Sequence, residues 1–235
     1  MSAERPFWRY PDLLLFFGLA VPCILTGMLL TKAVDVLFHL NLDKGLLLIP
    51  GQFLGYGFLF FTLSWILKLE YGRPFWRSLG WVPFPQSLAT TILCGVLLTF
   101  AVAAGGALLR TPDVDTPLRE MLAKRSTAIL IAVAGTTVGP LCEELGFRGF
   151  LQPLLVGTFG PLRGIILASL PFGLLHAAQN AFSWRHVLLI TLAGMAFGAM
   201  RHISGSTRAS TWMHAAYNST MFVAFFAAER KAPGW

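Results

Sequence analysis

Apolar runs long enough to cross a lipid bilayer recur along this chain and constrain its fold more than any other feature. A hydrocarbon core takes roughly 20 helical residues to cross, and runs near or above this length lie at about 12–38, 46–69, 88–109, 127–152, 161–178, 187–201 and 209–228. Of the 235 residues, 55% are hydrophobic and only 12% are charged, whereas a soluble domain carries about 25% charged residues. Because the backbone of a lipid-exposed segment must satisfy its own hydrogen bonds, the sequence predicts an all-α, polytopic transmembrane helical bundle of about seven to eight spans.

The segments between the runs show no sign of a second domain. Residues 71–87 are too interrupted by Pro and Gly to span, and their Trp and Arg residues suit the membrane interface. Residues 110–126 form the most polar stretch and predict an external loop with a short amphipathic turn. We therefore expect one transmembrane domain over residues 1–235, with a motif-bearing core at about 127–228.

The formal net charge of +7 comes from Lys and Arg that stand singly or in pairs between apolar runs. This distribution lacks the basic stripe of a nucleic-acid-binding protein and suits contact with the headgroups of a lipid bilayer. We expect a multi-pass integral membrane protein, in the plasma membrane if the source is prokaryotic. Lys and Arg divide about equally between the two sides of the predicted bundle, so they do not decide its orientation.

Small-xxx-small patterns within the apolar runs include Gly51 with Gly55 and Gly194 with Gly198. Small residues at this spacing let helices approach closely. Packing within one chain is the expected use, and the predicted assembly is a monomer or a weak homodimer.

The stretch LCEELGFRGF at 141–150 places three ionisable residues in an apolar run. An ionised side chain at the bilayer centre is unfavourable by about 2.5–3.5 kcal/mol on insertion scales, so such residues usually face a protein interior or cavity. Glu144 and Arg148 are four residues apart, share a helix face and can pair. Glu143 points about 100° away and has no cation at helical spacing. A buried ion-pair cluster that holds helices together is the structural alternative to a functional role.

Polar residues recur in the next apolar runs. His176 is expected in the middle of the run at 161–178, and His214 and Asn218 share one face of the last run. Three runs that each present polar groups predict one water-filled cavity between helices. The remaining histidines fall near predicted span ends, where an interfacial imidazole needs no special explanation; they are His39, His186 and His202.

A Glu, two His and an Asn suit the hydrolysis of a peptide bond. A carboxylate in apolar surroundings holds a proton more tightly than one in water, so it can act as a general base near neutral pH. Imidazole and amide groups can hold the water or donate to the oxyanion. The set Glu143, His176 and His214 could instead hold one divalent zinc ion with a water in the fourth position. Residue identity leaves the metal-dependent and metal-free mechanisms open.

The motifs EELGFR, FGLLH and HAAYN, in this order on separate apolar runs, resemble the EExxxR, FxxxH and HxxxN signatures of the CPBP family. This is the family of CAAX proteases and bacteriocin-processing enzymes, also called Abi, which includes the Ras-converting prenyl-protein endopeptidase. The resemblance covers about residues 140–220. It implies an intramembrane protease, of the metallo- or glutamate type, acting on a membrane-associated protein or peptide such as a prenylated CAAX-type protein.

The resemblance also implies roles for individual residues. Glu143 would activate the water with His176 as its partner, and His214 with Asn218 would form the oxyanion site. Glu144, Arg148 and Phe172 would support this geometry. The competing interpretation is a non-catalytic scaffold or regulator that binds a partner membrane protein; a proton-coupled transporter would fit the polar residues but not the three motifs.

Overall fold

The computed structural model describes residues 6–115 and 117–229, which fold into helices joined by short loops. The elements are α1 (Tyr10–Leu37), α2 (Lys44–Leu69), α3 (Phe75–Ser78), α4 (Leu88–Leu108), α5 (Pro117–Leu122), α6 (Arg125–Thr136), α7 (Val138–Glu144), η1 (Leu145–Leu151), α8 (Gln152–Phe159), α9 (Pro161–Leu175), η2 (Ala178–Asn180), α10 (Trp184–Ser204) and α11 (Thr207–Glu229). This part of the chain contains no strand, so the all-α prediction is confirmed.

Five helical segments are long and apolar enough to cross a membrane. They are α1, α2, α4, α10 and the run from α6 to α8, Arg125–Phe159. Leucines such as Leu14, Leu29 and Leu97 are exposed on these segments, as lipid-facing side chains are. The other two predicted runs are also helical, but α9 has only 15 residues and α11 is less apolar. The chain is therefore a multi-pass membrane protein, and its described residues contain five candidate spans of full length.

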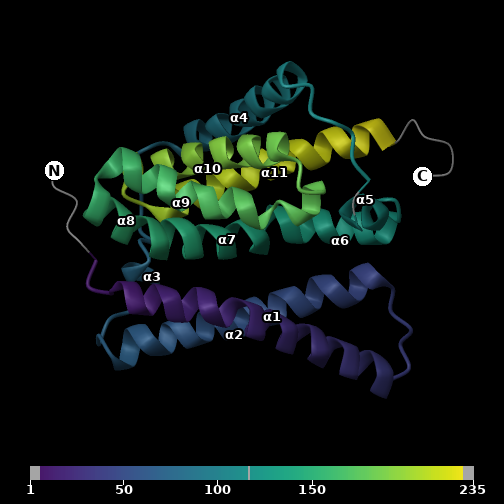
Figure 1. The fold of residues 1–235 in the computed structure, drawn as a ribbon, viewed down its shortest axis with the longest axis horizontal. Coiled ribbons are helices and arrows are strands. Elements are labelled where there is room, and N and C mark those ends of the chain that lie inside the picture. Colours follow the sequence, from purple (N-terminus) through teal and green to yellow (C-terminus); the bar gives the residue numbers. More distant parts are fainter. Residues whose placement is uncertain (1–5, 116, 230–235) are drawn as a thin grey trace.

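Helices α1 and α2 form an antiparallel hairpin that lies beside the rest of the molecule (Figure 1). The hairpin is close-packed because glycines of α2 lie against the backbone of α1. A Cβ on Gly55 would lie 2.8 Å from the Cys23 carbonyl oxygen, and a Cβ on Gly51 would lie 2.9 Å from Met28 Cα. The prediction that this glycine pair serves packing within the chain is confirmed.

The hairpin contacts the rest of the molecule at both of its ends. At one end, the Trp8 indole donates a hydrogen bond to the Phe150 carbonyl at 3.1 Å, and the Phe16 and Phe150 rings are 5.3 Å apart. At the other end, Asp43 caps α2 and accepts a hydrogen bond from Lys124 at 2.6 Å. The hydrogen bond from Lys124, with that from the α2 backbone, holds the pKa of Asp43 below its usual value.

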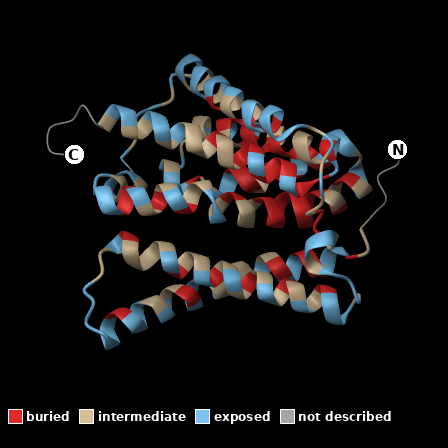
Figure 2. Cartoon of the chain, turned by 180° about the vertical axis from the view of Figure 1, so that it is seen from behind, coloured by how far each residue is buried: buried red, intermediate tan, exposed pale blue. Residues whose placement is uncertain are grey.

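The remaining helices form a second layer around the buried core. Figure 2 shows buried positions concentrated in this layer rather than in the hairpin. Gly194 and Gly198 of α10 belong to this core, where a Cβ on Gly198 would lie 2.7 Å from Gln152 Oε1 and 2.9 Å from Ile165 Cγ2. This second glycine pair also packs within the chain, as predicted.

The run predicted at 127–152 is helical but not uniform. The backbone breaks at Thr137, with φ −123° and ψ −85°, between α6 and α7. After Glu144 the chain forms the π-helix η1, and all of Leu145–Leu151 is buried. A π-helix is rare and is found frequently at functional sites. Both glutamates therefore end α7, while Arg148 lies in the wider turns of η1.

Candidate active site

Glu144 and Arg148 form a fully buried ion pair. Arg148 Nη1 lies 3.1 Å from Glu144 Oε1, and both side chains are 0% exposed. Arg148 Nη2 also donates to the Gly194 carbonyl of α10 at 2.8 Å, and the guanidinium lies over the Phe172 ring at 4.2 Å. The predicted pairing of these two residues is confirmed, and it joins α7, η1, α9 and α10 around one cation.

His214 of α11 lies between the two adjacent glutamates. Its Nδ1 is 3.0 Å from Glu144 Oε1, and its Nε2 is 3.8 Å from Glu143 Oε2. An ionised carboxylate only accepts hydrogen bonds. His214 Nδ1 therefore carries the hydrogen and donates the hydrogen bond that Glu144 accepts. Nε2 is thereby directed toward Glu143, and the ring is held by the glutamate that is already paired.

Aromatic rings fix the plane of His214. Phe197 of α10 stacks on the imidazole with centroids 4.3 Å apart and an interplanar angle of 17°. Phe172 meets the same imidazole edge-on at 5.9 Å and 79°. Sequence reasoning missed Phe197, because nothing in its local sequence distinguishes it among the 20 phenylalanines.

Glu143 is the accessible glutamate of the pair. Its side chain is 25% exposed while that of Glu144 is 0% exposed. A water molecule can therefore reach the carboxylate of Glu143 but not that of Glu144.

His176 is the C-cap residue of α9, so its expected place in the middle of a span is wrong. The helix ends at Leu175, and a 3-10 turn, η2, begins at Ala178. The His176 Nδ1 lies 2.8 Å from the Phe172 carbonyl oxygen, which can only accept. Nδ1 is therefore the donor, and a neutral ring keeps Nε2 as an acceptor. The Phe172 ring, 4.9 Å from His176, also contacts His214.

The predicted site residues are thus brought together to different degrees. Within the described residues, no hydrogen bond or ion pair joins His176 to Glu143 or His214, and Phe172 contacts both imidazoles. Asn218 lies one turn after His214 and donates to the Gly135 carbonyl of α6 at 2.7 Å. A primary amide has two N–H groups, so this bond positions the Asn218 amide and leaves its second N–H for another acceptor.

Across residues 6–115 and 117–229, no three His, Cys, Asp or Glu side chains lie close enough together to hold a metal ion. The binding of a zinc ion by Glu143, His176 and His214 stays a prediction.

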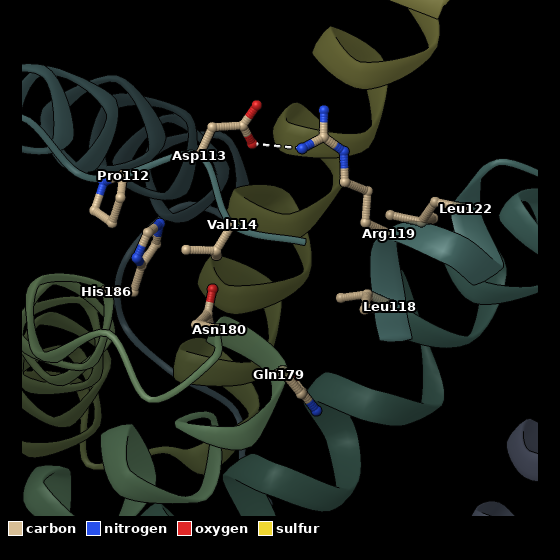
Figure 3. Close-up of a pocket in the computed structure, with 9 residues that line it drawn as sticks. All are labelled: Pro112, Asp113, Val114, Leu118, Arg119, Leu122, Gln179, Asn180 and His186. Carbon is tan, nitrogen blue, oxygen red and sulfur yellow. Dashed lines mark hydrogen bonds and ion pairs between the residues drawn. The ribbon is translucent and has the colours of Figure 1, made fainter. Parts of the chain in front are cut away.

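A separate hollow of about 200 Å³ lies at the end of α9 that carries His176 (Figure 3). It is bounded by the loop before α5, by α5 and by the segment from η2 to α10. Asp113 and Arg119 pair across it at 2.6 Å, and the Asn180 amide on its wall donates to the His176 carbonyl at 2.9 Å. The hollow therefore adjoins the turn that positions His176, although neither glutamate lines it.

A family comparison covers the segment that builds this site. Residues 125–220 match the family model described as type II CAAX prenyl endopeptidase Rce1-like. These residues are an Rce1-like domain. The Rce1-like domain begins with α6, ends within α11 and contains every catalytic and supporting residue predicted above. The hairpin, α3, α4 and α5 lie outside it. Neither a curated protein nor a solved structure shows a significant match to the chain.

Proposed function

We propose that the chain is an intramembrane endopeptidase that hydrolyses a peptide bond of a membrane-associated protein or peptide. One observation carries the proposal: His214 is fixed between two glutamates, with Nδ1 on the buried Glu144 and Nε2 toward the accessible Glu143. The Rce1-like domain supports the same activity. A purely structural ion-pair cluster would need no partly exposed second carboxylate.

In the first step, Glu143 takes a proton from a water molecule while the water oxygen attacks the peptide carbonyl carbon. The carbonyl π electrons move to its oxygen, which becomes an oxyanion. A charged His214 ring would donate from Nε2 to that oxygen, and the free N–H of Asn218 is the second donor. Losing one oxyanion donor typically lowers kcat by about 10²–10³.

In the second step, the carbon–nitrogen bond breaks and the leaving amine takes up the proton that Glu143 received. His176 assists the first step instead, through Nε2, which the Phe172 carbonyl leaves as an acceptor able to hold the attacking water. Glu144 and Arg148 are positioning residues in this scheme, because they touch His214 and the surrounding helices rather than the peptide.

The membrane surrounds this site on the proposed topology. We place α9 and α11 in the bilayer together with the five full-length segments, which gives seven crossings and a site enclosed by helices. The substrate class would be a lipid-associated protein or peptide, of which prenylated CAAX-type proteins are one kind. We further propose that the protein lies in the plasma membrane, if the source is prokaryotic, and that it is a monomer or a weak homodimer.

A comparison of protein termini in membranes tests the activity. Cells that express the wild type or Glu143→Gln at equal levels would be compared by mass spectrometry of N- and C-termini. We expect a set of new termini with the wild type that is absent with the variant. Identical termini from the two, with both proteins folded, would refute the protease and favour a scaffold that binds a partner membrane protein.

Metal dependence is a separate measurement on the purified protein. If cleavage persists under strong chelation in protein without stoichiometric metal, water activation rests on Glu143 itself. Loss of cleavage that only zinc restores would instead mean that Glu143, His176 and His214 close around an ion when it binds.

A further inference from the structure

Among the described residues, one end of the helical bundle carries cations that have no carboxylate partner. This end comprises the start of α1, the end of α2, α3, the α8–α9 corner and the turn between α10 and α11; Figure 1 shows α3, α8 and the start of α1 there. Hydrogen bonds join these parts, from Tyr10 to Thr158 at 2.9 Å and from the Thr207 amide to the Gly80 carbonyl at 2.9 Å. We call this region the cationic end, and its cations are Lys68, Arg73, Arg77, Arg163, Arg201 and Arg208.

The carboxylates at this end are already engaged. Within the described residues they are Asp12, which accepts from the Tyr71 hydroxyl at 2.6 Å, and Glu70, which pairs with Arg9 at 3.0 Å. No ion pair in the described residues joins a member of the cationic end to a carboxylate. The end therefore presents an uncompensated positive charge.

The opposite end of the bundle has a different charge balance. It carries carboxylates that pair with its own cations, as Asp43 does with Lys124 at 2.6 Å and Asp113 with Arg119 at 2.6 Å. Lys32 likewise pairs with Asp35 at 2.8 Å. The two ends have similar numbers of Lys and Arg but differ in how many are neutralised, a difference that only the fold reveals.

Arg201 anchors the cationic end to the helices. Its Nε donates to the Thr207 hydroxyl at 2.9 Å, and that hydroxyl donates to the Leu79 carbonyl at 2.6 Å. The guanidinium also packs on Gly80, where a Cβ would lie 2.9 Å from Arg201 Cζ. The anchored turn starts α11, which carries His214 two turns later.

We infer that the cationic end binds the anionic headgroups of phospholipids in one leaflet. Arg forks match phosphate geometry with two hydrogen bonds, and uncompensated cations at a membrane surface attract anionic lipid. Exposed Trp76 beside Arg77 places an aromatic ring at the depth of the headgroups. The inference requires no protease activity.

Thermal unfolding of the full chain in detergent tests this surface. The probes are phosphatidylglycerol and phosphatidylcholine with identical acyl chains, and inorganic phosphate at the same concentration. The test variant is Arg77→Gln/Arg163→Gln/Arg208→Gln, and the matched control is Lys44→Gln/Arg110→Gln/Arg125→Gln at the opposite end. Both variants remove three exposed cations.

Phosphatidylglycerol is expected to raise the Tm of the wild type and of the control more than phosphatidylcholine does. The test variant should lose about 2–4 °C of that difference for each cation removed. An equal loss in the control, or no preference for phosphatidylglycerol in the wild type, would overturn the inference. An equal Tm rise with inorganic phosphate would also overturn it, because it would show binding of a small ion rather than of a lipid surface.

Discussion

Replacing Glu144 with Gln leaves the Arg148 charge without its counter-charge in a site where both side chains are 0% exposed. Breaking a buried ion pair by removing one partner destabilises a protein by about 3–5 kcal/mol. A change of 1 kcal/mol shifts the Tm of a chain this long by about 2–4 °C. Glu144→Gln is therefore expected to lower the Tm in detergent by roughly 6–20 °C.

A second substitution separates the loss of charge balance from the loss of shape. Glu144→Gln/Arg148→Met removes both charges at similar volume, so no uncompensated charge is left in the buried site. The double variant also loses the hydrogen bond from Arg148 to the Gly194 carbonyl, worth about 1–3 kcal/mol. We expect it to recover at least half of the Tm that the single variant loses.

Melting curves of both variants, with Glu143→Gln as the matched control, measure these effects. Glu143 is partly exposed and forms no ion pair with an Arg or Lys among the described residues, so its variant should melt within a few degrees of the wild type. A Glu144→Gln protein as stable as the wild type, or a double variant as unstable as the single one, would refute the assignment of the pair as a buried structural unit.

Three further outcomes follow from the packing and the loop contacts. Gly194→Ala should destabilise the protein by about 1–3 kcal/mol, because the new Cβ would lie 3.0 Å from the buried guanidinium; thermal unfolding measures it. Phe197→Leu removes the ring stacked on His214 and should lower kcat by about two- to tenfold without raising KM, measured on a substrate found from the new termini. The folded-state pKa of Asp43 is lowered, first by the hydrogen bond from Lys124, so its stabilising contribution is present above the ordinary carboxyl pKa and is lost as pH falls through the lowered value. Asp43→Asn should therefore flatten the acid side of a plot of Tm against pH.

Each of these outcomes can be contradicted by a specific result. Gly57 has nothing within 4 Å of a built Cβ, so Gly57→Ala should not destabilise, and an equal loss in both alanine variants would contradict the packing explanation. If Phe197→Leu changes KM alone, the ring contacts substrate instead of positioning the imidazole. If Asp43→Asn leaves the acid side of the plot of Tm against pH unchanged, other carboxylates determine the loss of stability at low pH.

The sequence predicted the helices of the fold because apolar length is a local property. All seven predicted runs are helical, and the Glu144–Arg148 pair follows from a spacing of four residues. Hydropathy does not report helix type, so the break at Thr137 and the π-helix after Glu144 were not foreseen. The position of His176 at the C-cap of α9 was not predicted for the same reason, because an apolar run does not show where its helix ends.

The site depends on contacts between distant parts of the chain, and these were harder to predict. Polar residues in separate runs suggested a common cavity, and His214 does reach both glutamates. Nothing local connects Phe197 with His214, because this contact depends on how helices pack. The hydrogen bond from the Asn218 amide could not be predicted from the sequence either, because its acceptor is a backbone carbonyl of α6.

The π-helix η1 has a consequence for chain length. A π-helix takes more residues for each turn than an α-helix does, so η1 holds about one residue more than an α-helix would over the same turns. Deleting one residue from 145–151 would therefore let the segment become α-helical and leave the following helices close to their present register. Gln152 would still face α10, where it donates to the Gly198 carbonyl at 2.9 Å. The change would fall on the residues within the segment, among them Arg148, which pairs with Glu144. Homologous chains that keep this buried pair should therefore keep the length of the segment between Glu144 and Gln152.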